Sequence, residues 1–307
     1  MVHGHSHGDA TPAAANQRQW RRLAVALGSS VVVLTAVTVG GLVSGSLALL
    51  ADAAHQLADV FALALALTAT TLAARPPSQR RTFGWERAEV LAAGADALLL
   101  LGVTAWVAVE AVDRLRHPQP INAPLMLAAA AFGLVAGAVS LGFLHGGHRE
   151  SFAMRGAYLE VLGDLLGSLA AAVAALVIWA GGPLGSDAVA SLLIAALMAP
   201  RALMLLVSAA HVLLEGAPRG LDLGHVREHI LGVPGVLEVH DLHAWTISSG
   251  RPVLTAHVVV ADEAIGGDCG ASVLDRLADC LDHHFDVAHS TFQLEPAGHR
   301  DHEPRLH

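Results

Sequence analysis

The sequence predicts an α-helical membrane domain followed by a small α+β domain. Of the 307 residues, 54% are apolar and only 15% are charged. The mean hydropathy is +0.53, which is too high for an ordinary soluble chain. After Gly216 and Pro218, short amphipathic stretches replace the long apolar runs. We therefore expect a polytopic membrane protein that carries a soluble part.

The membrane domain is expected to span 21–210 and to contain six transmembrane helices. Apolar runs long enough to cross a hydrocarbon core of ~30 Å lie at about 22–43, 47–73, 88–112, 122–145, 157–180 and 186–208. The first twenty residues are polar and His-rich rather than signal-like, so the first run should remain as a helix.

The distribution of arginine predicts the orientation in the bilayer. Arginines gather before the first apolar run and in the second and fourth connections, whereas the opposite side has only Arg114 and Arg116. By the positive-inside rule both termini are cytoplasmic. We expect a multi-pass protein of the cell membrane with the lipid bilayer as a partner. The net charge of -9 argues against a nucleic-acid partner.

The last third of the chain, 211–296, predicts a cytosolic α+β domain with the element order α-β-β-α-β. The expected elements are a helix at 221–231, strands at 236–247 and 253–261, a helix at 271–285 and a strand at 290–295. Both helices should cover one side of a three-stranded sheet. Such a small domain suits docking, sensing or dimerisation. The His-containing tails, 1–20 and 297–307, are expected to be disordered.

Two expected membrane helices each carry a pair of metal-capable side chains four residues apart, His55 with Asp59 and Glu160 with Asp164. Four residues are about one helical turn, so each pair lies on one face and the two pairs could close a four-ligand site. A single such residue could merely satisfy an interhelical hydrogen bond. Two matched pairs favour a divalent cation, and so a metal-ion transporter. Protons would compete for the same ligands, with His55 best suited to that exchange.

Several segments resemble the cation diffusion facilitator family, most closely its zinc-type branch. They are SGSLALLADAAHQLAD at 44–59, RTFGWERAEVL at 81–91, VLGDLLGS at 161–168, HDLHAWTI at 240–247 and TFQLE at 291–295. The resemblance covers nearly the whole chain. It implies a homodimeric metal/proton antiporter, not an enzyme, with six helices and a ferredoxin-like, metallochaperone-like cytosolic domain. Zn²⁺ would be the transported ion and a regulatory ion, with no organic cofactor.

One position departs from the family pattern. Zinc-type members usually have His where this chain has Glu160. One imidazole and three carboxylates still accept zinc but discriminate less against harder cations. A broader exporter of Cd, Co, Fe or Mn is therefore an alternative to a zinc exporter.

By the same resemblance, His240, His257, His289 and Glu295 are expected to form a cytosolic metal site, while His243 is expected to be structural. The alternative is that these are ordinary surface histidines of a chain with 19 His residues. A further family site lies in the connection at 75–81, which here contains neither His nor Asp, so we expect no metal there.

Asp96 is a further intramembrane carboxylate, expected to line the ion pathway or to join a hydrogen-bond network. Cys269 and Cys280 are roughly 16 Å apart on one expected helix, which forbids a mutual disulfide.

An intramembrane metallohydrolase is disfavoured because no His-Glu-x-x-His segment is present. A membrane-anchored metal sensor would leave the membrane pairs unexplained.

Overall fold

The structure is a computed structural model that describes residues 31–145, 152–248, 251–265, 267–287 and 289–299. The predicted tail at 1–20 lies outside the described residues, as does most of the tail at 297–307. The chain divides into two compact units, whose boundaries fall within α2, α3 and α6.

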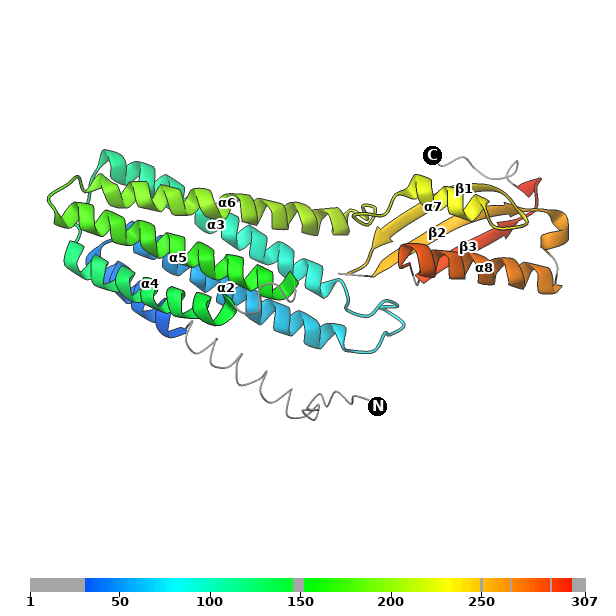
Figure 1. The fold of residues 1–307 in the computed structure, drawn as a ribbon, viewed down its shortest axis with the longest axis horizontal. Helices are drawn as coiled ribbons and strands as arrows, with labels where there is room; N and C mark the ends of the chain where they lie inside the picture. The colour runs from blue at the N-terminus through cyan, green and yellow to red at the C-terminus, as the bar shows by residue number, and fades with distance from the viewer. Residues whose placement is uncertain (1–30, 146–151, 249–250, 266, 288, 300–307) are drawn as a thin grey trace, which may run out of the picture. The chain divides into compact units, whose positions relative to one another are not determined.

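The helices of the membrane part follow the predicted apolar runs (Figure 1). They are a helix at Val31–Ser44, then α2 (Leu47–Ala73), α3 (Ala88–Arg116), α4 (Ala123–His145), α5 (Phe152–Trp179) and α6 (Gly185–Leu213). By length and composition, α3 and α6 and the segments Ala123–Gly142 and Val161–Trp179 are long and apolar enough to cross a membrane. The predicted helical membrane domain is confirmed.

Small residues bring α5 close to the middle of α4 and to the second turn of α2. A Cβ atom added to Gly133 on α4 would lie 2.8 Å from the Ser168 hydroxyl on α5. A Cβ atom added to Gly167 on α5 would lie 3.1 Å from a carboxylate oxygen of Asp52 on α2. Small residues at these crossings permit close backbone approach, the usual way in which membrane helices pack. Gly133 thus lets α5 approach α4, and Gly167 lets it approach the polar segment of α2.

Asp187, near the start of α6, caps the N-terminus of α2. Its buried carboxylate accepts hydrogen bonds from the Ser46 hydroxyl at 2.6 Å and from the backbone N–H groups of Leu47 at 2.7 Å and Ala48 at 3.1 Å. Arg114 lies 3.9 Å from the same carboxylate and donates to the Gly45 carbonyl at 2.7 Å. A helix N-terminus favours a negative charge. These contacts fix the N-terminus of α2 relative to α6 and α3.

The C-terminal domain has the predicted order, with one short 3₁₀ turn added. Its elements are α7 (Leu223–Leu231), β1 (Val236–Thr246), β2 (Pro252–Val260), η1 (Asp262–Ala264), α8 (Gly267–Phe285) and β3 (His289–Glu295). The sheet order is β1-β2-β3, with β1 antiparallel and β3 parallel to β2 (Figure 1). The predicted α-β-β-α-β domain is confirmed.

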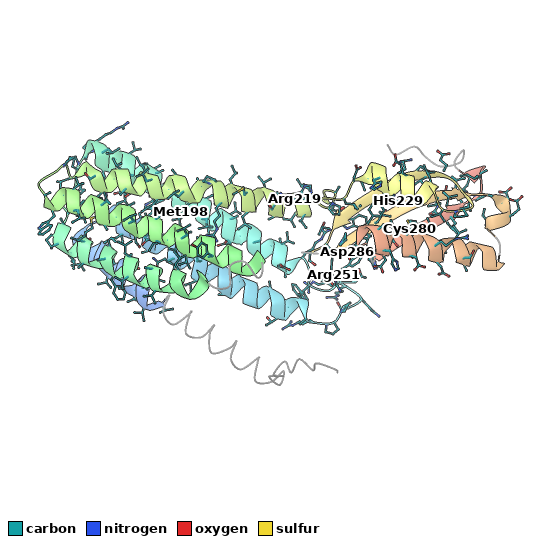
Figure 2. The ribbon with its side chains drawn as sticks, viewed as in Figure 1. Met198, Arg219, His229, Arg251, Cys280 and Asp286 are labelled. Carbon is teal, nitrogen blue, oxygen red and sulfur yellow. The ribbon has the colours of Figure 1, made fainter. Side chains whose placement is uncertain are left out.

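Both helices of this domain pack on the same face of the sheet. Val226 and Ile230 of α7 and Leu277 of α8 share a core with Leu254 and Val258 of β2. His229 and Cys280, labelled in Figure 2, mark α7 and α8. Successive strand residues point to opposite faces, so the residues that alternate with this core, His257 among them, lie on the face away from the helices.

Candidate metal centres

A polar cluster lies between α2 and α5 inside the membrane part. The Nε2 atom of His55 is 3.7 Å from a carboxylate oxygen of Asp59, one turn along α2. The same Nε2 atom is 3.5 Å from a carboxylate oxygen of Asp164 on α5. His55 is 8% exposed, and the three residues offer ligand atoms that all lie within 4.8 Å of one another. The structure therefore brings together three of the four predicted membrane ligands.

This cluster has the donor set of a divalent cation site. An imidazole nitrogen and carboxylate oxygens bind such ions at about 2.0–2.2 Å, so small side-chain rotations would bring all three onto one ion. Two carboxylates and one neutral imidazole carry a net negative charge. A divalent cation supplies the opposite charge at contact distance, which makes the polar cluster tolerable at membrane depth.

Glu160 lies on α5 one turn before Asp164. Its side chain is outside the part of the chain that the structure describes. Helical geometry places positions 160 and 164 on the same face. The participation of Glu160 as a fourth ligand accordingly stays a prediction.

Asp52 supports the cluster one turn toward the start of α2. Its carboxylate accepts hydrogen bonds from Ser168 of α5 at 3.1 Å and from Gln56 at 3.4 Å. Ser168 is one turn after Asp164 on α5, so the two helices are joined both at the cluster and one turn away from it. Asp96, the other predicted intramembrane carboxylate, is buried on α3.

Arg201 of α6 is a neighbour of the cluster that the sequence analysis missed. Its guanidinium lies 3.8 Å from the second carboxylate oxygen of Asp59. The signal was present in the sequence, because Arg201 is a charged residue directly after Pro200 in an otherwise apolar run. The Arg201 side chain therefore supplies a positive charge beside the cluster, in addition to that of any bound metal ion.

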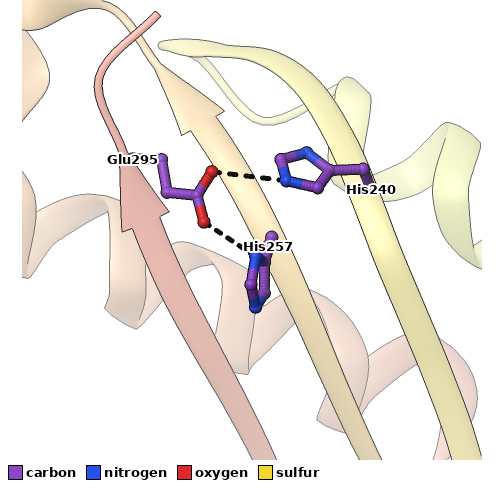
Figure 3. Close-up of side chains that lie close together, drawn as sticks. All are labelled: His240, His257 and Glu295. Carbon is purple, nitrogen blue, oxygen red and sulfur yellow. Dashed lines mark ion pairs between the residues drawn. The ribbon is translucent and has the colours of Figure 1, made fainter. Parts of the chain in front are cut away.

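A second cluster lies on the sheet of the C-terminal domain (Figure 3). The carboxylate of Glu295 on β3 is 3.3 Å from Nε2 of His240 on β1 and 2.8 Å from Nδ1 of His257 on β2. The strand register sets this arrangement, since His240 is directly opposite His257. Glu295 is 1% exposed, and the three residues offer ligand atoms within 4.8 Å of one another. Two imidazoles and a carboxylate are suitable zinc ligands.

The structure does not bring His289 into this second cluster. His289 begins β3 and pairs with Val253, whereas Glu295 ends the strand and pairs with Val259. Six residues of strand separate the two by about 20 Å. His289 is exposed, and its ring lies 5.8 Å from the ring of Phe83. His243 is exposed on β1 beyond a register shift that follows His240.

Each cluster lies in a segment that matches a family model of cation efflux proteins. Residues 23–214 match the family model of the cation efflux transmembrane domain, and residues 218–297 match that of the cation efflux protein cytoplasmic domain. The chain belongs to the cation efflux, or cation diffusion facilitator, family. The three-residue membrane cluster falls in the first match and the sheet cluster in the second. Cation efflux proteins are transporters, so the chain is a transporter and not an enzyme.

Curated relatives of this cation efflux protein match along most of its length. The metal cation efflux system protein CzcD of Cupriavidus metallidurans is 42% identical over 97% of this chain and 91% of its own length. The zinc transporter ZitB of Escherichia coli is 39% identical over 96% of this chain and 93% of its own. A cadmium, cobalt and zinc/H(+)-K(+) antiporter of Bacillus subtilis is 34% identical over 85% of this chain and 84% of its own.

Proposed function

We propose that the chain exports divalent metal cations across the cell membrane in exchange for protons, with zinc among its cargoes. The observation that carries this proposal is the position of His55, whose Nε2 atom lies within 4 Å of carboxylate oxygens from two different helices. The names of CzcD, ZitB and the Bacillus subtilis antiporter support metal efflux by a related chain.

Proton exchange follows from the chemistry of the ligands. A metal-binding imidazole or carboxylate must be deprotonated, so protons and the cation compete for the same atoms. When the cluster opens toward the side with more protons, protonation of His55 and of the carboxylates displaces the cation. When it opens toward the metal-containing side, the cation displaces the protons. One shared site therefore couples opposite movements of metal and protons.

The cargo range depends on position 160. If the Glu160 carboxylate completes the site, it contains one nitrogen and three carboxylate donors. Oxygen donors favour harder ions, and nitrogen donors favour zinc and its neighbours in the transition series. We propose transport of zinc together with other divalent ions such as Cd, Co, Fe or Mn.

The C-terminal domain is proposed to lie in the cytosol, with both termini on that side, and to join two chains as a homodimer. The cytoplasmic-domain family match supports this placement. His240, His257 and Glu295 are proposed to hold a regulatory zinc ion. A buried carboxylate between two imidazoles favours such an ion, because the ion satisfies all three groups at once.

The test is a simultaneous record of metal and proton movement. Purified protein in vesicles containing a zinc dye and a pH dye would receive external zinc under an outward proton gradient. The proposal predicts zinc entry with a matching loss of internal protons. An intramembrane metallohydrolase or a membrane-anchored metal sensor would move neither ion. Zinc entry with no proton counter-movement would contradict the exchange mechanism.

A further inference from the structure

Three histidines gather where α7 meets the end of α8, on the helical face of the C-terminal domain. His225 and His229 are one turn apart on α7, with ring centroids 4.5 Å apart. His284 of α8 has its ring centroid 5.2 Å from that of His229. The sheet cluster of His240, His257 and Glu295 lies on the opposite face of the sheet, so the two groups of histidines are separate.

Backbone hydrogen bonds fix which nitrogen of two rings is available. Nδ1 of His229 lies 3.0 Å from the carbonyl oxygen of His225, and Nδ1 of His284 lies 3.0 Å from the carbonyl oxygen of Cys280. A carbonyl oxygen only accepts, so each Nδ1 must carry the proton. In the neutral form of each ring, Nε2 then presents its lone pair. Histidine metal ligands typically donate the other ring N–H in this way, often to a backbone carbonyl.

Phe285 holds the rings in place. Its ring contacts His229 edge-on at a centroid distance of 4.9 Å and His225 edge-on at 5.6 Å. Phe285 also packs against the core of the domain. Edge-on contacts with a ring anchored in the core limit side-chain rotation. Less conformational entropy is therefore lost when the histidines bind a common ligand.

His229 borders an open groove of about 510 Å³ whose lining includes Glu228, Arg276 and Cys280. The exposed rings of His225 and His284 remain open to solvent and to ions that arrive from it.

We propose that His225, His229 and His284 form an exchangeable site for a borderline divalent cation, such as Zn²⁺, on the helical face of the C-terminal domain. Two histidines one turn apart on a helix can bind such an ion from one side, and a rotation of the His284 side chain would bring the third imidazole to it from α8. Three imidazoles leave a fourth position for water. Ligands of this kind suit Zn, Co, Ni and Cu and disfavour Mg and Ca. This site is distinct from the transport site and does not depend on transport.

Histidine footprinting of the full chain in detergent tests this proposal. Diethyl pyrocarbonate modifies unprotonated imidazole nitrogens, and peptide mapping gives a rate for each histidine with and without added Zn²⁺. We expect zinc to slow modification of His225, His229 and His284 severalfold. His283 is the matched control, because it is on the same turn, has the same Nδ1 bond to a backbone carbonyl at 2.9 Å and makes no ring contact with a described residue. Its rate should not change.

Single substitutions test whether one zinc ion binds all three histidines or whether each histidine is protected independently. In His229→Ala, zinc should no longer protect His225 and His284, and the protein should bind one equivalent of zinc fewer in equilibrium dialysis. His283→Ala should bind as much as the wild type. Protection of His257 in both variants would show that the sheet remains folded. Equal rates with and without zinc at the three histidines, or protection that survives His229→Ala, would overturn the proposal. Equal protection of His283 would do the same.

Discussion

The guanidinium of Arg201 lies 3.8 Å from Asp59, the carboxylate that His55 approaches from the same helix at 3.7 Å. Two cations thus compete for the Asp59 carboxylate, namely the Arg201 guanidinium and the transported ion. The Arg201 side chain is 44% exposed, so solvent screens much of its attraction for Asp59. The remaining attraction should still lower the affinity of the cluster for metal.

Removal of this charge is expected to tighten metal binding. In Arg201→Gln the half-saturating zinc concentration for uptake should fall roughly fivefold, which corresponds to about 1 kcal/mol. The maximal rate should also fall, because a more tightly held ion leaves more slowly. Concentration-dependent zinc uptake into vesicles measures both. Arg116→Gln, at the exposed end of α3, is the control for loss of one positive charge. An unchanged or higher half-saturating concentration in Arg201→Gln would rule out this role for Arg201.

Glu160→His is expected to narrow the cargo range. The substitution replaces an oxygen donor with a nitrogen donor and leaves His55, Asp59 and Asp164 in place. Uptake of Zn, Cd, Co, Mn and Fe by both proteins would be compared at equal concentrations. Mn and Fe transport should fall relative to Zn, because harder ions lose an oxygen ligand. Identical ion profiles would show that position 160 does not set selectivity.

Loss of the α2 cap is expected to destabilise the bundle. Asp187→Ala leaves the Ser46 hydroxyl and the N–H groups of Leu47 and Ala48 without this acceptor. It also removes the carboxylate that lies 3.9 Å from Arg114, which keeps its ion pair with Glu110. Unsatisfied buried donors and a broken ion pair should cost about 3 kcal/mol. Thermal unfolding in detergent would show a lower midpoint. Ser186→Ala, whose exposed hydroxyl donates to Pro183, should unfold close to the wild-type midpoint, and an equal loss in both variants would contradict the capping role.

Zinc is expected to stabilise the C-terminal domain through the sheet cluster. A ligand at about a hundredfold excess over its Kd adds roughly 2.7 kcal/mol to the free energy of unfolding. Zinc should therefore raise the unfolding temperature of the wild type, and Glu295→Gln should abolish most of that rise. His289→Ala should keep it, since His289 begins the strand that Glu295 ends. A loss of the zinc response in His289→Ala would show that His289 is a ligand after all.

The sequence predicts contacts within one helix better than contacts between separate elements. The spacing of His55 and Asp59 within one helix is visible in the chain, because helical periodicity is local. The register that sets His240 opposite His257 comes from strand pairing, and sequence alone does not fix it. The rise per residue of a strand places His289 and Glu295 at opposite ends of β3, whereas the family resemblance implied that both bind one ion. Arg201 was missed because its partner Asp59 is on another helix.

The most direct test of the account is zinc entry into vesicles under a fixed proton gradient. Wild type, Asp164→Asn and Asp113→Asn would be compared at equal amounts of folded protein. Asp164 contributes an oxygen 3.5 Å from His55, whereas Asp113 is an exposed carboxylate at the end of α3. The account predicts that Asp164→Asn loses nearly all zinc entry and that Asp113→Asn keeps the wild-type rate. Wild-type zinc entry in Asp164→Asn would contradict transport through this cluster.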